Sequence, residues 1–285
     1  MIKEKRLDSW AQFKDTIADI RRDYGYHEVE RPDGGTYKRK NTMLFRGQNN
    51  ANWRIQTTLE RKTFLPMHVA RYMTYADYCV NEIESCTGRS WNVPSAPQMR
   101  DEIDKVQDKF RVHLPAYEYL VYLRHHSFPS PLLDWTESPF IAAFFAFWEK
   151  PACSEVAVYS YVESVNGGRS PHEGSPMIRV QGPYVTTHAR HFAQKTLCTV
   201  ATRWNADKKQ HYFCSHHDVF DQDDPEQDIL IKIIIPSSVR MESLKELLLD
   251  YNISPFTLFQ TEDALVCTFR ENGRGPFRVS KLILQ

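Results

Sequence analysis

The side chains best suited to chemistry lie in one polar stretch that separates the two apolar segments of residues 120–148. The stretch holds two imidazoles, a carboxylate and a hydroxyl, from His125, His126, Asp134 and Thr136. Groups of this kind, fixed at the edge of a core, can move a proton or orient a ligand, so we treat the stretch as a candidate site. Structural roles fit the same residues, because histidines at a helix end can cap its last carbonyls and an aspartate before a helix can cap its amides.

Two predicted helices hold this stretch in place. The first has its apolar face at residues 116–123, ends at the histidines and is followed by a turn at residues 127–129. The second begins at Ser138 and Pro139, with the serine as cap and the proline at the first helical position. Residues 140–148 are apolar nearly all round, so we expect this helix to be buried. The polar residues just before it should then lie at the edge of the core.

A second candidate group is an arginine in the segment MLFRGQ, residues 43–48, which is typical of a strand that ends in a loop. Arg46 lies near the end of the strand and is followed by Gly47. An arginine binds phosphate or carboxylate through parallel hydrogen bonds, and a glycine lets a ligand approach the backbone closely. The segment therefore predicts an anion-binding strand end, with an ordinary surface arginine as the alternative.

The composition sets wider limits on the class of protein. The 285 residues suffice for one large domain or two small ones, and a hydrophobic content of 41% allows a substantial core. The 36 basic and 36 acidic residues cancel, so no global field attracts nucleic acid or a membrane, although a local basic groove stays possible. Six cysteines without a CxxC pair argue against a zinc ribbon and fit a reducing compartment. With neither a signal region nor a membrane-length apolar run, we expect a cytoplasmic protein without a membrane partner.

The chain begins with a predicted amphipathic helix that is either core or an interface. A capping box at Ser9 and Gln12 precedes it, and its apolar stripe is formed by Trp10, Phe13, Ile17, Ile20 and Tyr24. A polar, turn-rich link follows at residues 31–42. We assign residues 1–42 to an N-terminal helix and linker, and residues 43–285 to a single domain with a helical insertion at about 64–126.

The order of the remaining elements predicts an α+β fold. Residues 64–88 and 101–113 are helical in pattern, and the second segment has its apolar face at Ile103, Val106 and Phe110. Strands are predicted at residues 154–162, after a polar loop that begins at residue 189, and most strongly at 228–236. A helix is expected at 241–251, and two further strands at 253–259 and 264–269. Helices thus dominate the first half and strands the second, around the strand that carries the arginine.

Several motifs occur in a fixed order along the chain: LFRGQ at 44–48, LRHHSFPSPLLDWTESPFIAAFFAF at 123–147, ARHFAQKT at 189–196, IKIIIP at 231–236 and ISPFTLFQTEDAL at 253–265. With them the chain resembles the FRG-domain family, named for its Phe-Arg-Gly motif, from about residue 44 to residue 269. The family's central motif reads like Gln-His-Tyr/His-Gly-Leu-Pro-Thr-Arg-Leu-Leu-Asp-Trp-Thr. This chain has Arg124 for the glutamine, Ser127 for the glycine, and Ser130 and Pro131 for Thr-Arg. Of the family's later Gln-x-Gly-x-Phe motif, Gln194 is the residue that is clearly present.

The resemblance implies a mixed-sheet core like that of ADP-ribosyltransferases, with NAD as co-substrate and no metal. Arg46 on the first strand would hold the NAD phosphate or ribose, and Asp134 and Thr136 would lie at the nicotinamide side. Either His125 or His126 would orient the ribose or act as the general base. The remaining residues implied to contact NAD are Phe45, Gly47, Gln48, Trp135 and Gln194. The late acidic residue that faces the ribosyl cation would be Glu262, or its role falls to the position of Gln194.

Three functions are compatible with these expectations. The first is an NAD-dependent ADP-ribosyltransferase that acts as a toxin or antiphage defence effector on RNA, DNA or protein, with nucleic acid favoured by the family context. Its acceptor could be reached through scattered basic and aromatic residues: Arg54, Arg61, Lys62, Arg203 and Trp204. The second is a non-catalytic binding or sensor module that recognises a nucleotide or a phage component. The third is a nuclease that uses His125, His126 and Asp134, with or without a metal.

A toxin of this kind would require a neutralising partner, of antitoxin or chaperone type. The apolar N-terminal helix is the place where we expect such a partner to dock.

Overall fold

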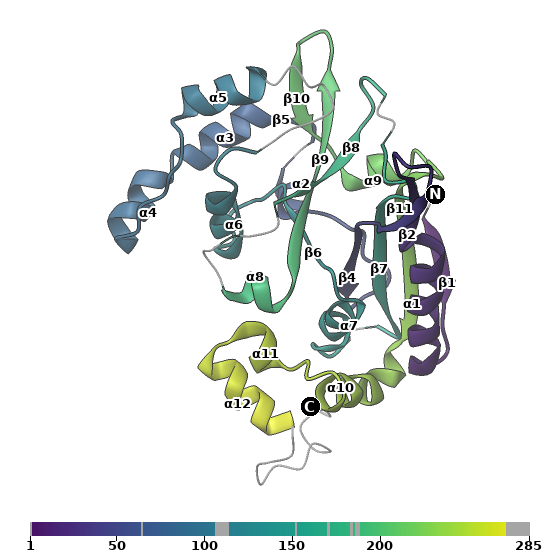
Figure 1. Ribbon diagram of the computed structural model, residues 1–285. Helices are drawn as coiled ribbons and strands as arrows, with labels where there is room; N and C mark the ends of the chain where they lie inside the picture. The colour runs from purple at the N-terminus through teal and green to yellow at the C-terminus, as the bar shows by residue number, and fades with distance from the viewer. Residues whose placement is uncertain are drawn as a thin grey trace.

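A mixed β-sheet with helices packed against it forms the body of the protein (Figure 1). The computed structural model describes residues 2–63, 65–105, 114–151, 153–169, 172–182, 185 and 189–271. The strands of the sheet are β1 (Lys3–Arg6), β4 (Met43–Gln48), β5 (Met67–His68), β6 (Leu133–Thr136), β7 (Glu155–Ser164), β8 (Met177–Gln181), β9 (Thr196–Asn205), β10 (Gln210–Phe213) and β11 (Gln227–Pro236), and a separate hairpin is formed by β2 (Tyr26–Glu30) and β3 (Thr36–Lys40).

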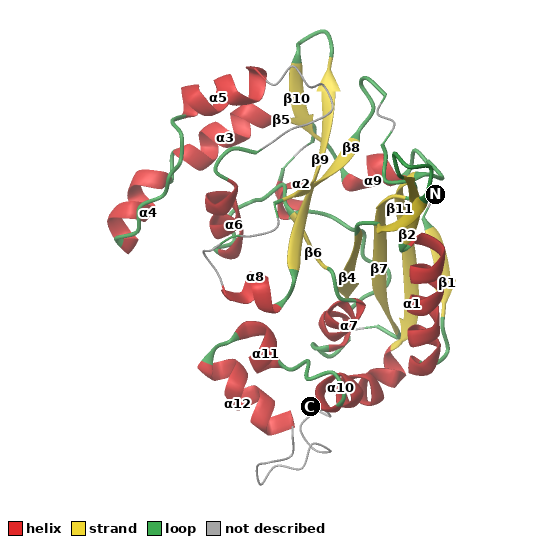
Figure 2. Cartoon of the chain, in the orientation of Figure 1, coloured by secondary structure: helices red, strands yellow, loops and turns green. Residues whose placement is uncertain are grey.

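Helices precede, interrupt and follow these strands, as the colouring of Figure 2 shows. They are α1 (Trp10–Tyr24), α2 (Thr58–Lys62), α3 (Val69–Asp77), α4 (Val80–Thr87), α5 (Ala96–Lys105), α6 (Tyr117–His125), α7 (Pro139–Phe147), α8 (Ala189–Ala193), α9 (His216–Phe220), the 3₁₀ turn η1 (Ser237–Val239), α10 (Arg240–Leu249), α11 (Pro255–Phe259) and α12 (Glu262–Glu271). This mixture of helices with a large mixed sheet confirms the α+β class.

The sheet runs in the order β1-β11-β7-β4-β6-β9-β10-β5, and β8 pairs with β9 beside this path. The pair β1 and β11 is parallel, and the other pairs are antiparallel. The arginine strand β4 is central, as the sequence predicts. Its antiparallel neighbour on one side, β7, follows it for its full length, from Met43 opposite Val162 to Gln48 opposite Ala157.

The other side of β4 is different, because β4 and β6 pair at a single position, Phe45 opposite Thr136. Beyond this pair the two strands do not continue as a ladder, while β6 goes on to pair with β9 over its whole length. Backbone and side-chain groups at such a break face each other across a gap instead of bonding to a neighbouring strand. The discontinuity creates the space in which the candidate site lies.

Helix α1 confirms the predicted amphipathic pattern and belongs to the core. Ser9 caps it by accepting a hydrogen bond from the amide of Gln12 at 3.3 Å. Its apolar stripe is buried: Trp10, Phe13, Ile17 and Ile20 pack with helix α7 and with strands β7 and β11. The stripe is therefore core, and it does not offer the free apolar surface expected for a neutralising partner.

Helix α7 is buried on nearly every side, as its continuous apolar sequence predicts. Ser138 caps it through the amide of Ile141, and Pro139 occupies the first turn, which confirms the predicted start. Ala142, Phe144 and Phe147 belong to the same core cluster as the stripe of α1. In Figure 1 the helix lies against β4 and β7, with α10 beneath it.

The helices between β4 and β6 enclose a second core. Its members come from α3, α5, α6 and one face of β9 and β10, and include Tyr72, Met99, Tyr119, Leu120 and Phe213. Helix α6 ends at His125 with His126 at its cap, as predicted. The predicted helix at 101–113 is present through Lys105, and its remainder, which includes Val106 and Phe110, lies outside the described residues.

Four segments differ from their sequence-based predictions. Residues 253–259 and 264–269 are not strands but the helices α11 and α12. Ser254 forms a capping box with Thr257 and Pro255 lies in the first turn of α11, while Thr261 accepts a hydrogen bond from the amide of Ala264 at the start of α12. The polar link at 31–42 forms the turn and second strand of the β2–β3 hairpin. The expected polar loop from residue 189 contains the short helix α8 before strand β9, and the strand itself is confirmed.

Within the described residues, no helix combines the length and apolar character that a membrane crossing requires.

Candidate functional site

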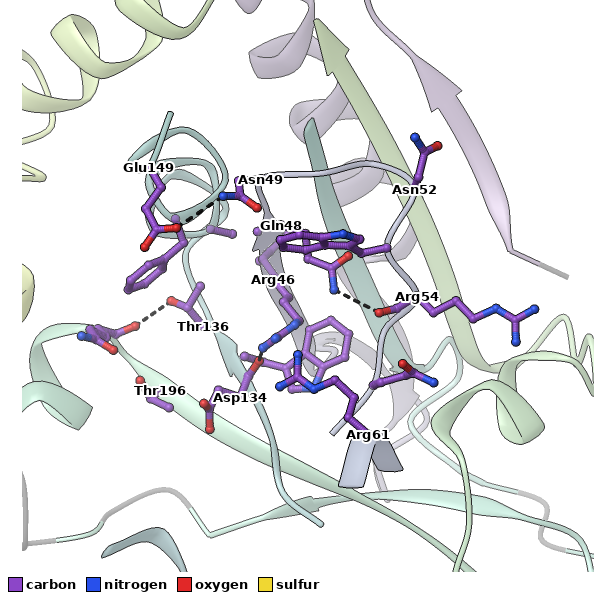
Figure 3. A pocket seen from close by; sticks show the side chains of 18 residues that line it. Arg46, Gln48, Asn49, Asn52, Arg54, Arg61, Asp134, Thr136, Glu149 and Thr196 are labelled. Atoms are coloured by element: carbon purple, nitrogen blue, oxygen red, sulfur yellow. Dashed lines mark hydrogen bonds between the residues drawn. The ribbon is translucent and has the colours of Figure 1, made fainter. Parts of the chain in front are cut away.

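A pocket of about 690 Å³ opens where β4 and β6 part, within the size range of small-molecule sites (Figure 3). Its walls come from β4 and the loop that follows it, from α2 and β6, from α7 and the residues just after it, and from the start of β9. The lining residues are Phe45, Arg46, Gly47, Gln48, Asn49, Asn52, Trp53, Arg54, Gln56, Arg61, Asp134, Trp135, Thr136, Ala142, Phe145, Glu149, Gln194 and Thr196.

Arg46 lies at the centre of this pocket and is tied to its far wall. Its Nη1 donates a hydrogen bond to the main-chain carbonyl of Asp134 at 2.7 Å, across the gap between β4 and β6. Its Nε is buried and makes no hydrogen bond to any described residue. Burial lowers the pKa of Arg46 to about 10, with Asp134 acting in the opposite direction, so the guanidinium stays charged at neutral pH. A buried cation with an unused donor is suited to bind an anionic ligand group.

Asp134 faces the same pocket, but another arginine already occupies its carboxylate. The guanidinium of Arg124 donates from Nε to Oδ1 and Oδ2 at 2.7 and 2.8 Å and also from Nη2, and Cys198 Sγ lies 3.3 Å from Oδ1. Burial acts to raise the pKa of Asp134, but the charges of Arg124 and Arg46 outweigh it and lower the pKa to about 2. Arg124, at the end of α6, thus supplies the guanidinium that pairs with this aspartate.

This pairing predicts how the stability of the fold depends on acid. Because the folded chain lowers the pKa of Asp134 from 3.8 to about 2, the pairing stabilises the fold above about pH 4, and this contribution disappears as pH falls toward 2. We expect the difference in urea midpoint between the wild type and Asp134→Asn to shrink between about pH 5 and about pH 2.5. A difference that stays constant over this range would contradict the assigned pKa.

The rim of the pocket is cationic and aromatic. Arg61 lies in α2, a short helix fixed by a capping box between Thr57 and Glu60, and Arg54 lies in the loop that follows β4 (Figure 3). Trp53, which directly precedes Arg54, exposes 54% of its surface, although an exposed indole loses the benefit of burial. Such a combination of guanidinium groups and a free aromatic face suits a ligand that carries phosphates and a planar ring.

Beneath the rim a buried chain of hydrogen bonds holds the wall of the pocket. Trp135 Nε1 donates to Thr199 Oγ1 at 2.8 Å, and this hydroxyl lies 3.0 Å from His216 Nε2. The ring of His216 in turn contacts Glu60 Oε1 through Nδ1 at 3.3 Å. Burial by itself raises the pKa of Glu60, but the bond to His216 and those from Thr57 and Ser215 lower it. The chain links β6 to α2 and so fixes Arg61 relative to the pocket.

In a comparison with known protein families, residues 41–154 match the sequence model of the FRG domain. This part of the chain is thus similar to an FRG domain. No curated protein and no solved structure matches the chain. The FRG match contains every lining residue of the pocket except Gln194 and Thr196, which β9 and the turn before it supply.

The fold brings most of the residues predicted for the site into one place. Phe45, Arg46, Gly47, Gln48, Asp134, Trp135, Thr136 and Gln194 all line the pocket. Thr136 donates to the main-chain carbonyl of Gln194 at 2.7 Å, and the side chain of Gln194 donates to the carbonyl of Leu258 at 3.1 Å. These bonds show that Thr136 and Gln194 join β6 to the segments before β9 and around α11.

Three predicted residues lie elsewhere. His125 points to α8, where its Nε2 is 3.0 Å from Nε2 of His191, and the ring of His126 packs on Tyr122 with centroids 4.3 Å apart. Glu262 is exposed in the first turn of α12. None of the three lines the pocket, because α6 ends before the gap between the strands and the C-terminal segment forms helices rather than strands. Among the described residues there is also no group of three metal-ligating side chains.

Other pocket residues were missed by the sequence analysis. Glu149, Asn49 and Trp53 line the pocket, and Arg54 and Arg61, noted only as scattered basic residues, meet at its rim. Arg203 and Trp204, noted with them, lie in β9 outside the lining, where Trp204 packs on His211. The signal that could have found Asn49, Trp53 and Arg54 is their position directly after the strand of the FRG motif, since residues that follow a strand end gather at that end of the sheet.

Gly47 has a different role from the one the sequence suggests. A Cβ added there would overlap the carbonyl oxygen of Ala142 and lie 2.7 Å from the amide nitrogen of Ala146. The close approach that glycine permits is therefore that of helix α7 to β4, and not that of a ligand to the backbone. The residue supports the site by allowing α7 to pack directly beneath the FRG motif.

Proposed function

We propose that this FRG domain binds NAD as a co-substrate and transfers ADP-ribose to an acceptor, on a core related to that of ADP-ribosyltransferases. The observation that carries the proposal is Arg46, a buried guanidinium with an unused Nε in a pocket whose rim holds Arg54, Arg61 and an exposed Trp53. The shared chemistry of these groups selects a ligand that combines phosphates with a planar base. NAD carries both features and supplies an activated ribosyl group.

The arrangement of the pocket suggests a division of labour for this reaction. Arg46 and Arg61 would hold the pyrophosphate, since the carboxylate of Asp134 is hydrogen-bonded to Arg124, while Arg46 bonds the main-chain carbonyl of Asp134. Trp53 would stack on the adenine, and the buried wall at Trp135 and Thr136 would receive the nicotinamide ribose end. Phe45 and Gln48 complete the floor, and Oε1 of Gln48 is buried without a hydrogen bond to any described residue.

The acceptor in this proposal is a macromolecule: RNA, DNA or protein. We favour nucleic acid, because Arg54, Arg61 and Lys62 are exposed on the two segments that form the rim. The wider biological proposal is a toxin or antiphage defence effector that acts in the cytoplasm and is held in check by an antitoxin or chaperone-type partner. Since the stripe of α1 is core, the partner would have to bind elsewhere, and a partner that covers the pocket mouth would block NAD directly.

A non-catalytic sensor is the second candidate, and one observation favours it. The titratable groups expected to do proton chemistry, His125, His126 and Glu262, lie outside the pocket, and Asp134 is neutralised. Under this alternative the same pocket binds a nucleotide or a phage component without turning it over. The nuclease hypothesis loses its basis, because His125 is directed at His191 while Asp134 is bound by Arg124.

The test is incubation of the purified protein with NAD labelled in the adenylate, together with total RNA, total DNA or cell lysate. We expect label on one fraction, and a loss of at least about 100-fold for Arg46→Ala, because a buried charged donor that stabilises a reacting group is typically worth this much. Arg71→Ala is the matched control, since Arg71 is exposed on α3, bonds to Tyr75 and does not line the pocket. It should retain full activity.

Each alternative gives a different result in the same experiment. NAD that binds, by calorimetry, without nicotinamide release would support the sensor and overturn the transferase. NAD that neither binds nor reacts, in a protein shown to be folded by circular dichroism, would overturn both uses of the pocket for NAD.

A further inference from the structure

The pocket contains a carboxylate that the sequence motifs do not point to. Among its described lining residues, the carboxylates are Asp134 and Glu149. Asp134 receives several hydrogen bonds from Arg124, and its charge is balanced by that guanidinium and by Arg46. Among the described lining residues, Glu149 is therefore the carboxylate that is available for a step that needs a free negative charge.

Glu149 lies just after helix α7, and a weak contact holds its side chain in the pocket. Among the described residues it accepts a hydrogen bond from Asn49, whose Nδ2 is 3.5 Å from Oε2, and this long bond leaves most of the carboxylate's acceptor positions open. The side chain is exposed on the side of the pocket mouth. In Figure 3, Glu149 and Asn49 are drawn on one side of the pocket and Arg61 and Asp134 on the other, with Arg46 between them.

The backbone that carries Glu149 is fixed more firmly than its side chain. The guanidinium of Arg240, from the start of α10, donates to the carbonyl of Phe147 at 2.6 Å and to that of Trp148 at 2.7 Å. The last carbonyls of a helix carry partial negative charge, which disfavours a carboxylate placed directly after them. Arg240 donates to two of these carbonyls and offsets their charge, so a carboxylate is tolerated at this position.

We propose that Glu149 is the catalytic carboxylate of this domain; the assignment rests on the proposed ADP-ribosyl transfer. In that reaction the bond between ribose C1′ and the nicotinamide nitrogen breaks, and its electron pair leaves with nicotinamide, which departs as a neutral ring. The ribosyl group becomes cationic, and the anionic carboxylate stabilises it. The acceptor's oxygen or nitrogen then bonds to C1′, and the proton it loses passes to the Glu149 carboxylate.

The other polar groups near the nicotinamide side are less suited to this task. The hydroxyl of Thr136 is engaged by the carbonyl of Gln194 and by the amide of Ser138, and Gln194 carries no charge. Glu262, the acid expected from the sequence, is exposed on α12 and does not line the pocket. Position, charge and open acceptor sites together assign the role to Glu149.

The experiment compares nicotinamide release and NAD affinity in Glu149→Gln, Glu149→Asp, Glu262→Gln and the control Glu137→Gln. Glu137 is an exposed acid between β6 and α7 that does not line this pocket. We expect Glu149→Gln to lower kcat by about 100-fold or more while NAD affinity changes by less than about threefold, because the carboxylate acts on the cation and not on bound NAD. Glu149→Asp should recover part of the rate.

Two results would overturn the assignment in distinguishable ways. Wild-type turnover in Glu149→Gln, or loss of turnover in Glu262→Gln while Glu149→Gln stays active, would remove Glu149 from catalysis and leave the transferase proposal standing. A wild-type protein that binds NAD but releases no nicotinamide would overturn the transferase and the role of Glu149 with it.

Discussion

Replacing Gly47 with alanine is expected to destabilise the protein by about 3 kcal/mol or more. The added methyl group would overlap the carbonyl oxygen of Ala142 and crowd the amide of Ala146, both of which are main-chain atoms inside helix α7. Backbone of a packed helix cannot turn aside as a flexible side chain can, so α7 would have to move away from β4. That movement would open the core shared by α1, α7, β7 and β11 and would displace Arg46 at the same time.

The measurement is urea unfolding followed by circular dichroism, with Gly168→Ala as the matched control. A methyl group added at Gly168 would meet no atom within 4 Å, so this variant should unfold within about 0.5 kcal/mol of the wild type. Equal stability of the two variants would show that α7 does not lie against the FRG strand as closely as described. A stable Gly47→Ala variant that has lost NAD binding would instead show that the glycine serves the ligand.

The second large effect is expected for Arg124→Leu, which leaves the carboxylate of Asp134 without its partner. Removing one member of a buried pair costs about 3 to 5 kcal/mol, and the lower end applies because Asp134 keeps 40% of its side-chain surface exposed. The freed carboxylate would also compete with the ligand for Arg46, so NAD affinity should fall although Arg124 does not line the pocket. Asp134 thus couples the stability of the fold to the affinity for NAD.

Two further variants separate these effects. The double variant Arg124→Leu with Asp134→Asn should regain part of the lost stability, because it removes the unpaired charge. Arg22→Leu is the surface control: Arg22 pairs with Asp19 at 2.8 Å, but both side chains are largely exposed, so we expect a change below about 1 kcal/mol. If Arg124→Leu unfolds no more easily than Arg22→Leu, the pair does not stabilise the fold.

Local sequence was sufficient for those elements whose own residues contain the complete signal. Helix α7 follows from the cap at Ser138 and a run that is apolar on every side, and α1 from its stripe at helical spacing. Strand β11 follows from its run of residues rich in isoleucine. The C-terminal helices α11 and α12 were wrongly expected to be strands, because short apolar runs fit either element and their caps at Ser254 and Thr261 decided the outcome.

The composition of the pocket depended on contacts between segments far apart in the chain. The sequence singled out Arg46, Asp134 and Thr136, because an arginine near a strand end and polar groups just before a buried helix are unusual at the edge of a core. It could not show that Asp134 is bound by Arg124, since their pairing depends on how the end of α6 meets β6. Nor could it show that His125 turns to His191 while Glu149 enters the pocket, since these depend on the positions of α8 and α10.

The sequence by itself therefore determined which elements form and which of them must be buried, because periodicity, caps and apolar runs act over a few neighbouring residues. The tertiary structure decided which charged groups remain available in the pocket. A charge is neutralised or left free by partners that come from any part of the chain. Here β4 and β6 pair at a single position, and the gap beside that pair is the pocket that Arg46, Asp134 and Glu149 line.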